Sequence, residues 1–400
     1  MQSRERPLPE FDPVMSPANA SDPSALGQVV GLKPWFPWPL CRWRWLNEPV
    51  RAERLAALRI GVAVLTVLDV LLAFLPISAD IAGRDSIMSP TALAKHLEKS
   101  QRWSLLENLD EPGEVRLVLW IWAGTALLLA VGLFSRASAA ATWAIGVSVL
   151  NVNPIIDNAG DMVRSLATFY LMLSPCGAAW SVDAWWKRRY RWQWARLKGR
   201  WVWRIALVRR EQPLSGPFFI HPWPLCLLFV QMMVIYLFNG LSKSFGQTWH
   251  EGTSLYYVLS DLSLTRWSYA SLPLPLWLTG ALTLSVLWWE LLFAPVMMVP
   301  WHALADRLGR VKRWGIRHLA GPLRWNREVF LVFGAGFHLG ILISLELGLF
   351  APYMLCLYLP LLPWERLSGR GKPTSYGPSG DVKWDEANPP YPLEAAKRGS

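Results

Sequence analysis

Lys243 is the residue of this sequence that is best placed for acid–base chemistry. It follows PLCLLFVQMMVIYLF (224–238), a run without a charged residue, and Trp249, His250 and Glu251 come close behind it. An amine that is desolvated in a pocket is less stable as the ammonium and can act as a general base near pH 7. Neighbouring carboxylates and His250 could instead hold the ammonium charged as a binding group. The third interpretation is a lysine that extends to the lipid headgroups, and the sequence leaves all three open.

Asp161 and Arg164 form a second candidate pair, with Asn158 just before them. A spacing of three residues places both side chains on one face of a helix, where opposite charges attract. We expect the pair near the outer membrane face. It either arranges a substrate or is a structural ion pair that seals the end of a helix.

Glu290 and His338 interrupt two later apolar runs, VLWWELLFAPVMM and GAGFHLGIL. A charge inside a bilayer costs about 2.5–3.5 kcal/mol or more at the centre of a helix, so it needs a partner or water. We expect Lys243 near the outer face, His338 deeper and Glu290 deeper still. Together these side chains predict a polar pocket that opens outward.

The composition is that of an integral membrane protein. Of 400 residues, 52% are hydrophobic and 17% are charged, against about a quarter charged in soluble domains. The mean hydropathy is +0.22, and 26 tryptophans favour the membrane–water interface. The net charge of +11 does not indicate a nucleic-acid partner, because the basic residues cluster in loops between apolar runs. Neither the four cysteines nor the six histidines have metal-site spacing, so no metal is predicted.

Apolar runs of membrane-spanning length predict an all-α, polytopic helical bundle of seven to eight transmembrane helices. The runs lie at 55–77, 115–134, 137–153, 161–180, 223–242, 273–299 and 328–346, with a shorter one at 349–363 that either spans or re-enters.

Basic loops fix the expected orientation. Lys and Arg gather before the first run, between the fourth and fifth (187–210), and after the sixth (307–327). By the positive-inside rule these segments face the cytoplasm. We therefore expect a multi-pass inner-membrane protein with a cytoplasmic N-terminus.

Three segments organise the chain. Residues 1–50 are an expected disordered, basic N-terminal segment with an interfacial helix, 51–364 are the transmembrane domain, and 365–400 are a polar tail. Within the domain, the Trp- and Arg-rich segment 187–210 is expected to bind anionic lipid of the inner leaflet. Its spacing favours an amphipathic helix, with a β-hairpin turning at Lys198-Gly199 as the alternative.

One stretch, NVNPIIDNAGDMVRSLATFYLMLSPCGAAWSVDAWW (151–186), resembles the signature of the horizontally transferred transmembrane domain family. That family groups bacterial membrane proteins with the vitamin K-dependent γ-carboxylase. GLSKSFGQTWHEGTSLYY (240–257) is similar to its lysine segment, and FHLGILISLELGLFAPYML (337–355) to its late histidine-bearing helix. The resemblance covers about 54–363.

The resemblance implies a role for Lys243, because the carboxylase lysine of that segment is the base toward vitamin K hydroquinone. A quinone-like cofactor is therefore implied for this chain. Two departures separate it from glutamate carboxylation. No histidine stands at 158–161, where the carboxylase has a catalytic one, and 365–400 is a polar tail where the carboxylase has a large lumenal domain.

The first functional hypothesis is an enzyme, carboxylase- or lyase-like or a quinol-dependent oxidoreductase, that acts on a quinone-like or lipid-soluble molecule. Lys243 is its expected base and His250 or His338 assists. Around these, the expected binding or structural residues are Asn158, Asp161, Arg164, Trp249, Glu251 and Glu290.

Two other hypotheses compete with the enzyme. In one, the chain is a non-enzymatic accessory that helps to mature or export a secreted peptide or protein, which docks on its outer loops. In the other, the chain is a transporter, with Arg59, Asp69 and Glu290 on the inner side of its path. Asp183 after the fourth run has a structural interpretation, in which it caps or closes a turn together with Ser181.

Overall fold

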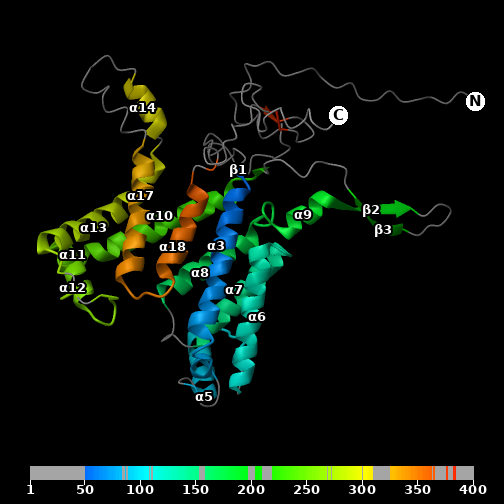
Figure 1. The fold of residues 1–400 in the computed structure, drawn as a ribbon, viewed down its shortest axis with the longest axis horizontal. Coiled ribbons are helices and arrows are strands. Elements are labelled where there is room, and N and C mark those ends of the chain that lie inside the picture. Colours follow the sequence, from blue (N-terminus) through cyan, green and yellow to red (C-terminus); the bar gives the residue numbers. More distant parts are fainter. Residues whose placement is uncertain are drawn as a thin grey trace, which may run out of the picture. The chain divides into compact units, whose positions relative to one another are not determined.

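The computed structural model describes most of the apolar part of the chain (Figure 1). It describes residues 50–362 with gaps at 83–85, 87–88, 108, 110, 153–157, 197–202, 210–218, 268, 272, 300 and 310–324, and beyond them 364, 375–376 and 382–383. The N-terminal segment, Asn153-Pro154, the Lys198-Gly199 turn, most of the last basic loop and most of the polar tail lie outside these residues.

The chain divides into two compact units. The larger comprises 51–220 and 224–362, and the smaller comprises 1–50, 221–223 and 363–400. In the smaller unit the described structure includes one antiparallel pair, β5 (Ser375–Tyr376) with β6 (Val382–Lys383).

Helices occupy all eight predicted apolar runs. They are α3 (Glu53–Asp69) continued by the π-helical η3 (Val70–Phe74), α6 (Pro112–Val131), α7 (Ser135–Val152), α8 (Ala159–Leu173), α10 (Trp223–Ser244), α13 (Leu276–Met298), α17 (Asn326–Ser344), and α18 (Phe350–Tyr358) with the 3₁₀ turn η4 (Leu359–Leu361). The shorter elements are β1 (Val50–Arg51), α4 (Ser78–Ile81), α5 (Pro90–Ser100), α9 (Val182–Arg189), β4 (Phe219–Ile220), α11 (Gln247–His250), α12 (Ser254–Ser260) and α14 (Trp301–Gly309).

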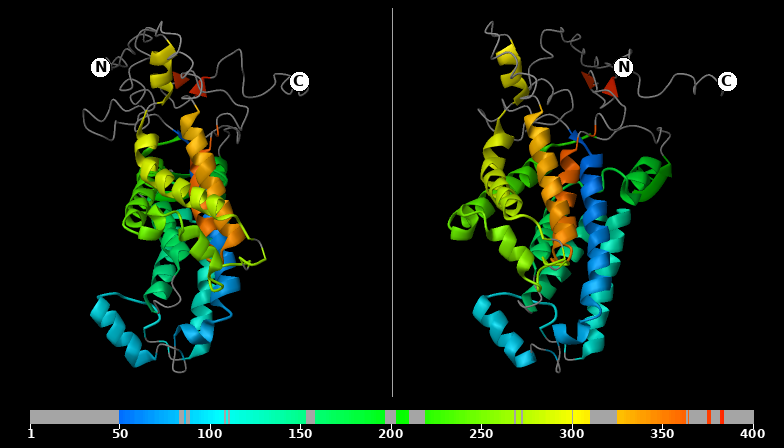
Figure 2. Two further views of the ribbon diagram at one scale, coloured as in Figure 1. Left: turned by 90° about the vertical axis from the view of Figure 1, so that its left-hand side faces the viewer. Right: turned by 60° about the vertical axis from the view of Figure 1, so that its left-hand side comes forward.

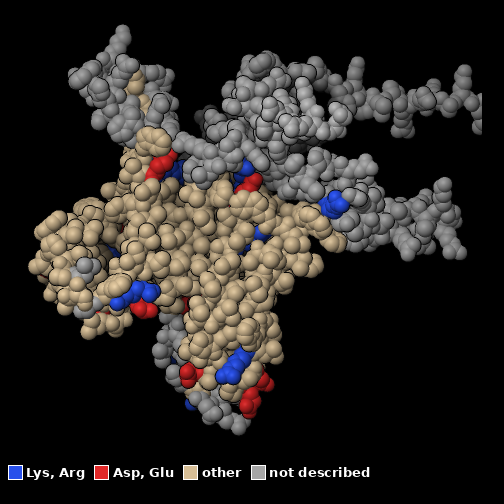
Figure 3. Space-filling view, viewed as in Figure 1, with Lys and Arg blue, Asp and Glu red and all other residues tan. Residues whose placement is uncertain are grey.

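Five of the described helices are long and apolar enough to cross a membrane. They are Glu53–Phe74, Pro112–Val131, Trp223–Ser244, Leu276–Met298 and Asn326–Ser344. The described residues are therefore mostly helical, which is compatible with the predicted helical bundle. The count of seven or eight spans stays a prediction. Figure 3 shows few charged side chains across the middle of the visible face, as a lipid-facing surface requires.

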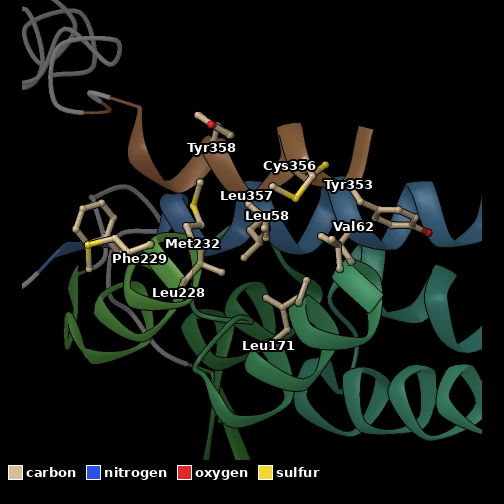
Figure 4. Close-up of a cluster of buried hydrophobic side chains, with 14 of the residues drawn as sticks. Leu58, Val62, Leu171, Leu228, Phe229, Met232, Tyr353, Cys356, Leu357 and Tyr358 are labelled. Atoms are coloured by element: carbon tan, nitrogen blue, oxygen red, sulfur yellow. The ribbon is translucent and has the colours of Figure 1, made fainter. Parts of the chain in front are cut away.

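The helices meet around α3 and α18. Helix α3 packs against α6, α8 and α18, α7 packs between α6 and α8, and α17 packs against α18 and α13 (Figure 2). Gly61 allows the closest approach of α3 to α18, because a Cβ there would lie 2.7 Å from the Sγ of Cys356. Figure 4 shows the resulting core, where Leu58 and Val62 of α3 face Leu357 of α18.

Local sequence signals fix several helix ends. Pro112 opens α6, where Glu111 and Glu114 form a capping box, and Gly132 ends it in the left-handed conformation at φ 73°. Asn158 caps α8: its Oδ1 accepts a bond from Gly160 N at 2.7 Å, and its own backbone N–H donates to Asp161 Oδ2 at 3.1 Å. Asn158 and Asp161 thus have a structural role at the start of α8.

The amphipathic helix favoured over 187–210 is wrong beyond residue 189. Strand β2 (Tyr190–Arg196) pairs antiparallel with β3 (Trp203–Arg209), with Tyr190 opposite Arg209. The hairpin alternative describes this segment, because alternating aromatic and β-branched residues suit an extended strand. Both patterns are present in the sequence, and the pairing of 190–196 with 203–209 satisfies backbone groups of both strands.

Candidate functional site

Lys243 forms an ion pair with Glu290 across two helices. Its Nζ lies 2.5 Å from Glu290 Oε1, and the side chains are 23% and 3% exposed. Gly240 makes this pairing possible, because its missing side chain lets α10 approach α13 closely: a Cβ there would lie 2.9 Å from Leu291 N. Lys243 follows Gly240 by three residues, so it lies on the same face of α10.

Glu290 was expected deeper in the membrane than Lys243, and this is wrong because the two side chains are in contact. Asp69 was expected on the inner side and Arg164 near the outer face, but these two side chains also form an ion pair. The position of a residue along an apolar run predicts its depth in the membrane only when the helix is perpendicular to the membrane plane. Close packing between helices brings opposite charges into contact at one depth, because a buried charge without a partner destabilises the fold far more than a paired one.

Aromatic rings surround the ammonium group of Lys243. Its Nζ lies 4.8 Å from the centroid of Trp249 and 5.9 Å from that of Phe337. A cation over an aromatic face gains about 0.5–1 kcal/mol when exposed and about 2 kcal/mol when desolvated. Lys243 is thus held by a carboxylate and two rings at a mostly buried position.

His338 belongs to the same region and is hydrogen-bonded to Tyr236, which is in turn hydrogen-bonded to Tyr358. Tyr236 Oη lies 2.8 Å from His338 Nε2 and 2.7 Å from Tyr358 Oη. The Phe337 ring, which faces Lys243, lies 5.1 Å from the imidazole of its neighbour His338. Neither tyrosine was among the predicted site residues, although a hydroxyl in an otherwise apolar helix is a signal for an internal partner.

Two buried polar atoms of this region have no hydrogen-bond partner among the described residues. They are Glu290 Oε2 and His338 Nδ1, and the residues are only 2% and 1% exposed. A buried polar atom without a partner costs about 1–3 kcal/mol. Such atoms are typical of sites that a ligand or water completes.

His250 and Glu251 do not join Lys243. Both residues are exposed; His250 Nε2 contacts Ser244 O at 2.5 Å, and Glu251 Oε1 accepts a bond from Gln247 at 2.6 Å. Helix α11 starts directly after α10 and turns these side chains outward, while Trp249 turns inward. The structure brings together Lys243, Trp249, Glu290 and His338 of the predicted site.

The predicted Asp161–Arg164 pair is present at 2.6 Å and has a third member. Arg164 Nη1 also contacts Asp69 of α3, which in turn accepts a bond from Tyr353 Oη at 3.3 Å. The guanidinium packs 4.6 Å from the ring of Trp122. This second cluster ties α3, α8 and α18 together.

Arg59 and Asp183 fasten the segment between α8 and α9. Arg59 is fully buried and donates to the carbonyls of Cys176, Ala179 and Trp180. Its role is therefore structural, which removes it from the transport path considered above.

Asp183 has the expected structural role, but it caps the start of α7 and not the turn that follows α8. It accepts bonds from Phe134 N at 2.8 Å, and from Ser135 N and Oγ at 2.7 Å each, at the start of α7. Ser181 caps α9 instead, because its Oγ accepts a bond from Ala184 N at 2.9 Å. The sequence WSVDA (180–184), within the stretch that carries the family resemblance, is thus explained by two helix caps.

Replacing Asp183 with alanine is expected to cost about 1–2 kcal/mol of unfolding free energy, the size of a lost helix cap. Partial burial raises the pKa of this carboxyl, but hydrogen bonds from Ser135 and Phe134 outweigh it and hold the pKa below its ordinary value. The contribution is therefore present above about pH 4 and is lost as pH falls through the folded-state pKa.

Equilibrium unfolding in detergent between pH 3 and 7 measures this effect. The difference between the wild type and Asp183→Ala should shrink toward the acid end. Glu98→Gln, a change at an exposed carboxylate of α5, is the control and should leave stability unchanged. An equal loss for Asp183→Ala at every pH would contradict the assignment.

Among the described residues, no group of three or more His, Cys, Asp or Glu side chains could hold a metal ion. Comparison of the chain with protein-family models, curated proteins and solved structures finds no match.

Proposed function

We propose that this chain is an inner-membrane protein of the horizontally transferred transmembrane domain type that binds a lipid-soluble, ring-bearing molecule beside Lys243. The N-terminus is assigned to the cytoplasm. The observation that carries the proposal is the Lys243–Glu290 pair, whose surroundings are aromatic and whose carboxylate has an unpartnered oxygen. Flat hydrophobic rings of the quinone class fit aromatic helix surfaces, and a few polar atoms orient them.

In this proposal Lys243 is the base and Glu290 controls its charge. As an ion pair, Lys243 holds its proton and cannot accept another. When a ligand displaces water, the local dielectric falls and separated charges become less favourable. A proton then moves from Lys243 Nζ to Glu290 Oε1, which leaves a neutral amine and a neutral acid. The amine then takes a proton from the ligand. Lys243 is again an ammonium, the ligand is the anion beside it, and Glu290 stays neutral.

The proposed roles of the other predicted residues follow from their positions. Trp249 and Phe337 are the ring contacts, and His338 is a hydrogen-bonding group. Asn158, Asp161 and Arg164 hold α8 in place and do not touch the ligand.

Replacing Lys243 with arginine separates binding from chemistry. Arginine keeps the positive charge and the Glu290 pair, but it does not release its proton. We expect the variant to retain a ring compound when purified from membranes, and to consume reduced quinone at least about 100-fold more slowly, the size of a lost general base.

Purified protein in lipid nanodiscs is incubated with reduced quinone, with and without bicarbonate, and both bound and converted quinone are quantified by chromatography. Lys95→Arg, an exposed lysine of α5, is the matched control and should behave as wild type. Turnover by Lys243→Arg equal to wild type would remove Lys243 from the chemistry.

The accessory role is the second candidate, and exposed apolar side chains after α10 favour it. Phe245 is 88% exposed and Leu262 is 74% exposed. A partner peptide docked there would bury both. Co-purification of one stoichiometric peptide, with no ring compound bound, is the result that this candidate predicts.

A further inference from the structure

Three buried side chains from three helices form one hydrogen-bonded chain. Tyr358 of α18 contacts Tyr236 of α10, and Tyr236 contacts His338 of α17. They are 6%, 1% and 1% exposed. No further hydrogen bond to either hydroxyl occurs within the described structure, so the chain has one free end at Tyr358 and one at His338 Nδ1.

The strength of the donors and acceptors decides the direction of the chain. A neutral imidazole carries one N–H, and each hydroxyl carries one proton. In either direction the two hydrogen bonds use two of the three protons, so one donor and one acceptor are left without a partner. They are the Tyr358 proton and the Nδ1 lone pair if His338 donates from Nε2, and the Nδ1 proton and the Tyr358 oxygen if Tyr358 donates to Tyr236 and Tyr236 donates to Nε2. A phenol hydroxyl is a more acidic donor than the N–H of a neutral imidazole, and an imidazole nitrogen is a stronger acceptor than a phenol oxygen, so the second direction is preferred.

Gly334 makes room for this chain. A Cβ at this position would overlap the Tyr358 hydroxyl and the ring of Trp289. Gly336 lies in the same helix, but a Cβ there would meet nothing within 4 Å. The glycine at 334 is therefore required by the position of the hydroxyl, and the one at 336 is not.

We propose that the Tyr358–Tyr236 hydroxyl pair is a positioning device that fixes His338 in the tautomer with its proton on Nδ1. Tyr236 holds Nε2 as an acceptor, and the ring cannot turn without breaking that bond. The imidazole then presents one N–H donor at a buried position.

The use of that donor rests on the proposed function. His338 Nδ1–H donates to an oxygen of the bound molecule, while Glu290 Oε2 accepts from a hydroxyl or other donor on it. The site therefore fits a molecule with both an acceptor and a donor, and it discriminates against plain hydrocarbon chains. Neither tyrosine touches the ligand, so both act through His338.

The test is ¹⁵N NMR of the full chain labelled at histidine, in nanodiscs at neutral pH. Subtracting the spectrum of His338→Gln assigns the His338 ring nitrogens. The expected wild-type spectrum has a protonated Nδ1 and an unprotonated Nε2. A protonated Nε2, or an imidazolium, would overturn the proposal.

Variants then separate positioning from general folding. Tyr236→Phe removes the donor to Nε2 and should release the tautomer, so that the two nitrogen signals shift toward each other. Gly334→Ala should move them in the same direction, while Gly336→Ala should leave them in place. Unchanged signals in a folded Tyr236→Phe protein, checked by gel filtration, would overturn the proposal.

Adding a short-chain quinol distinguishes this inference from the proposed function. A shift of the Nδ1 signal supports both. A fixed tautomer whose Nδ1 signal does not respond to the quinol leaves the positioning role intact and overturns quinol binding at this site.

Discussion

Arg164→Met is expected to lower the free energy of unfolding by about 3–5 kcal/mol, the cost of leaving buried carboxylates without their cation. Arg164 is 2% exposed and contacts both Asp161 and Asp69. Methionine matches much of its volume, so the lost charge dominates the effect. The two carboxylates then face each other in an apolar bundle with no other cation in contact among the described residues.

Asp69 should account for most of this loss. Asp161 keeps the bond from Asn158 N and the positive end of α8. Asp69 lies within α3 and keeps only the Tyr353 hydroxyl. Arg164→Met combined with Asp69→Asn is therefore expected to be more stable than Arg164→Met alone.

Equilibrium unfolding in detergent micelles measures both variants, with Arg102→Met at an exposed arginine as the control. Trp122 beside the guanidinium provides a local fluorescence signal. A loss below about 1 kcal/mol for Arg164→Met, the level of an exposed ion pair, would show that the cluster is solvated.

Lys243→Met is expected to cost about 3–5 kcal/mol because it leaves Glu290 as an uncompensated buried charge. Glu290 is 2% exposed, and one of its oxygens already lacks a partner. Adding Glu290→Gln removes the charge. The double variant should therefore be more stable than Lys243→Met, although it carries one more substitution.

The same unfolding measurement yields the coupling energy of the pair through a double-mutant cycle. Lys95→Met at an exposed lysine is the matched control. If the double variant were less stable than the wild type by the sum of the two single losses, the two side chains would be independent, contrary to the ion pair.

Helix positions were predictable because long apolar runs have few alternatives in a membrane. The Asp161–Arg164 pair was predictable for a similar reason, since a spacing of three fixes it within one helix. Pairs between helices were not predictable. Helix packing, which glycines such as Gly240 permit, decides the pairing of Lys243 with Glu290 and of Arg164 with Asp69. No short sequence pattern predicts that packing.

The loop after α10 shows the same limit at short range. Lys243, His250 and Glu251 are close in sequence, which favoured one site. The start of α11 instead sends His250 to the carbonyl of Ser244 and leaves Glu251 exposed. A continuous helix would keep Lys243 and His250 on one face, because they are seven residues apart, and one change of direction in the chain separates them.

A density map of the protein purified from its own membranes without added ligand is the most direct test of the central claim. The expected result is a flat ring system in contact with Lys243, bordered by Trp249 and Phe337 and bonded to Glu290 or His338. Lipid chains alone at that position, beside an intact Lys243–Glu290 pair, would contradict it.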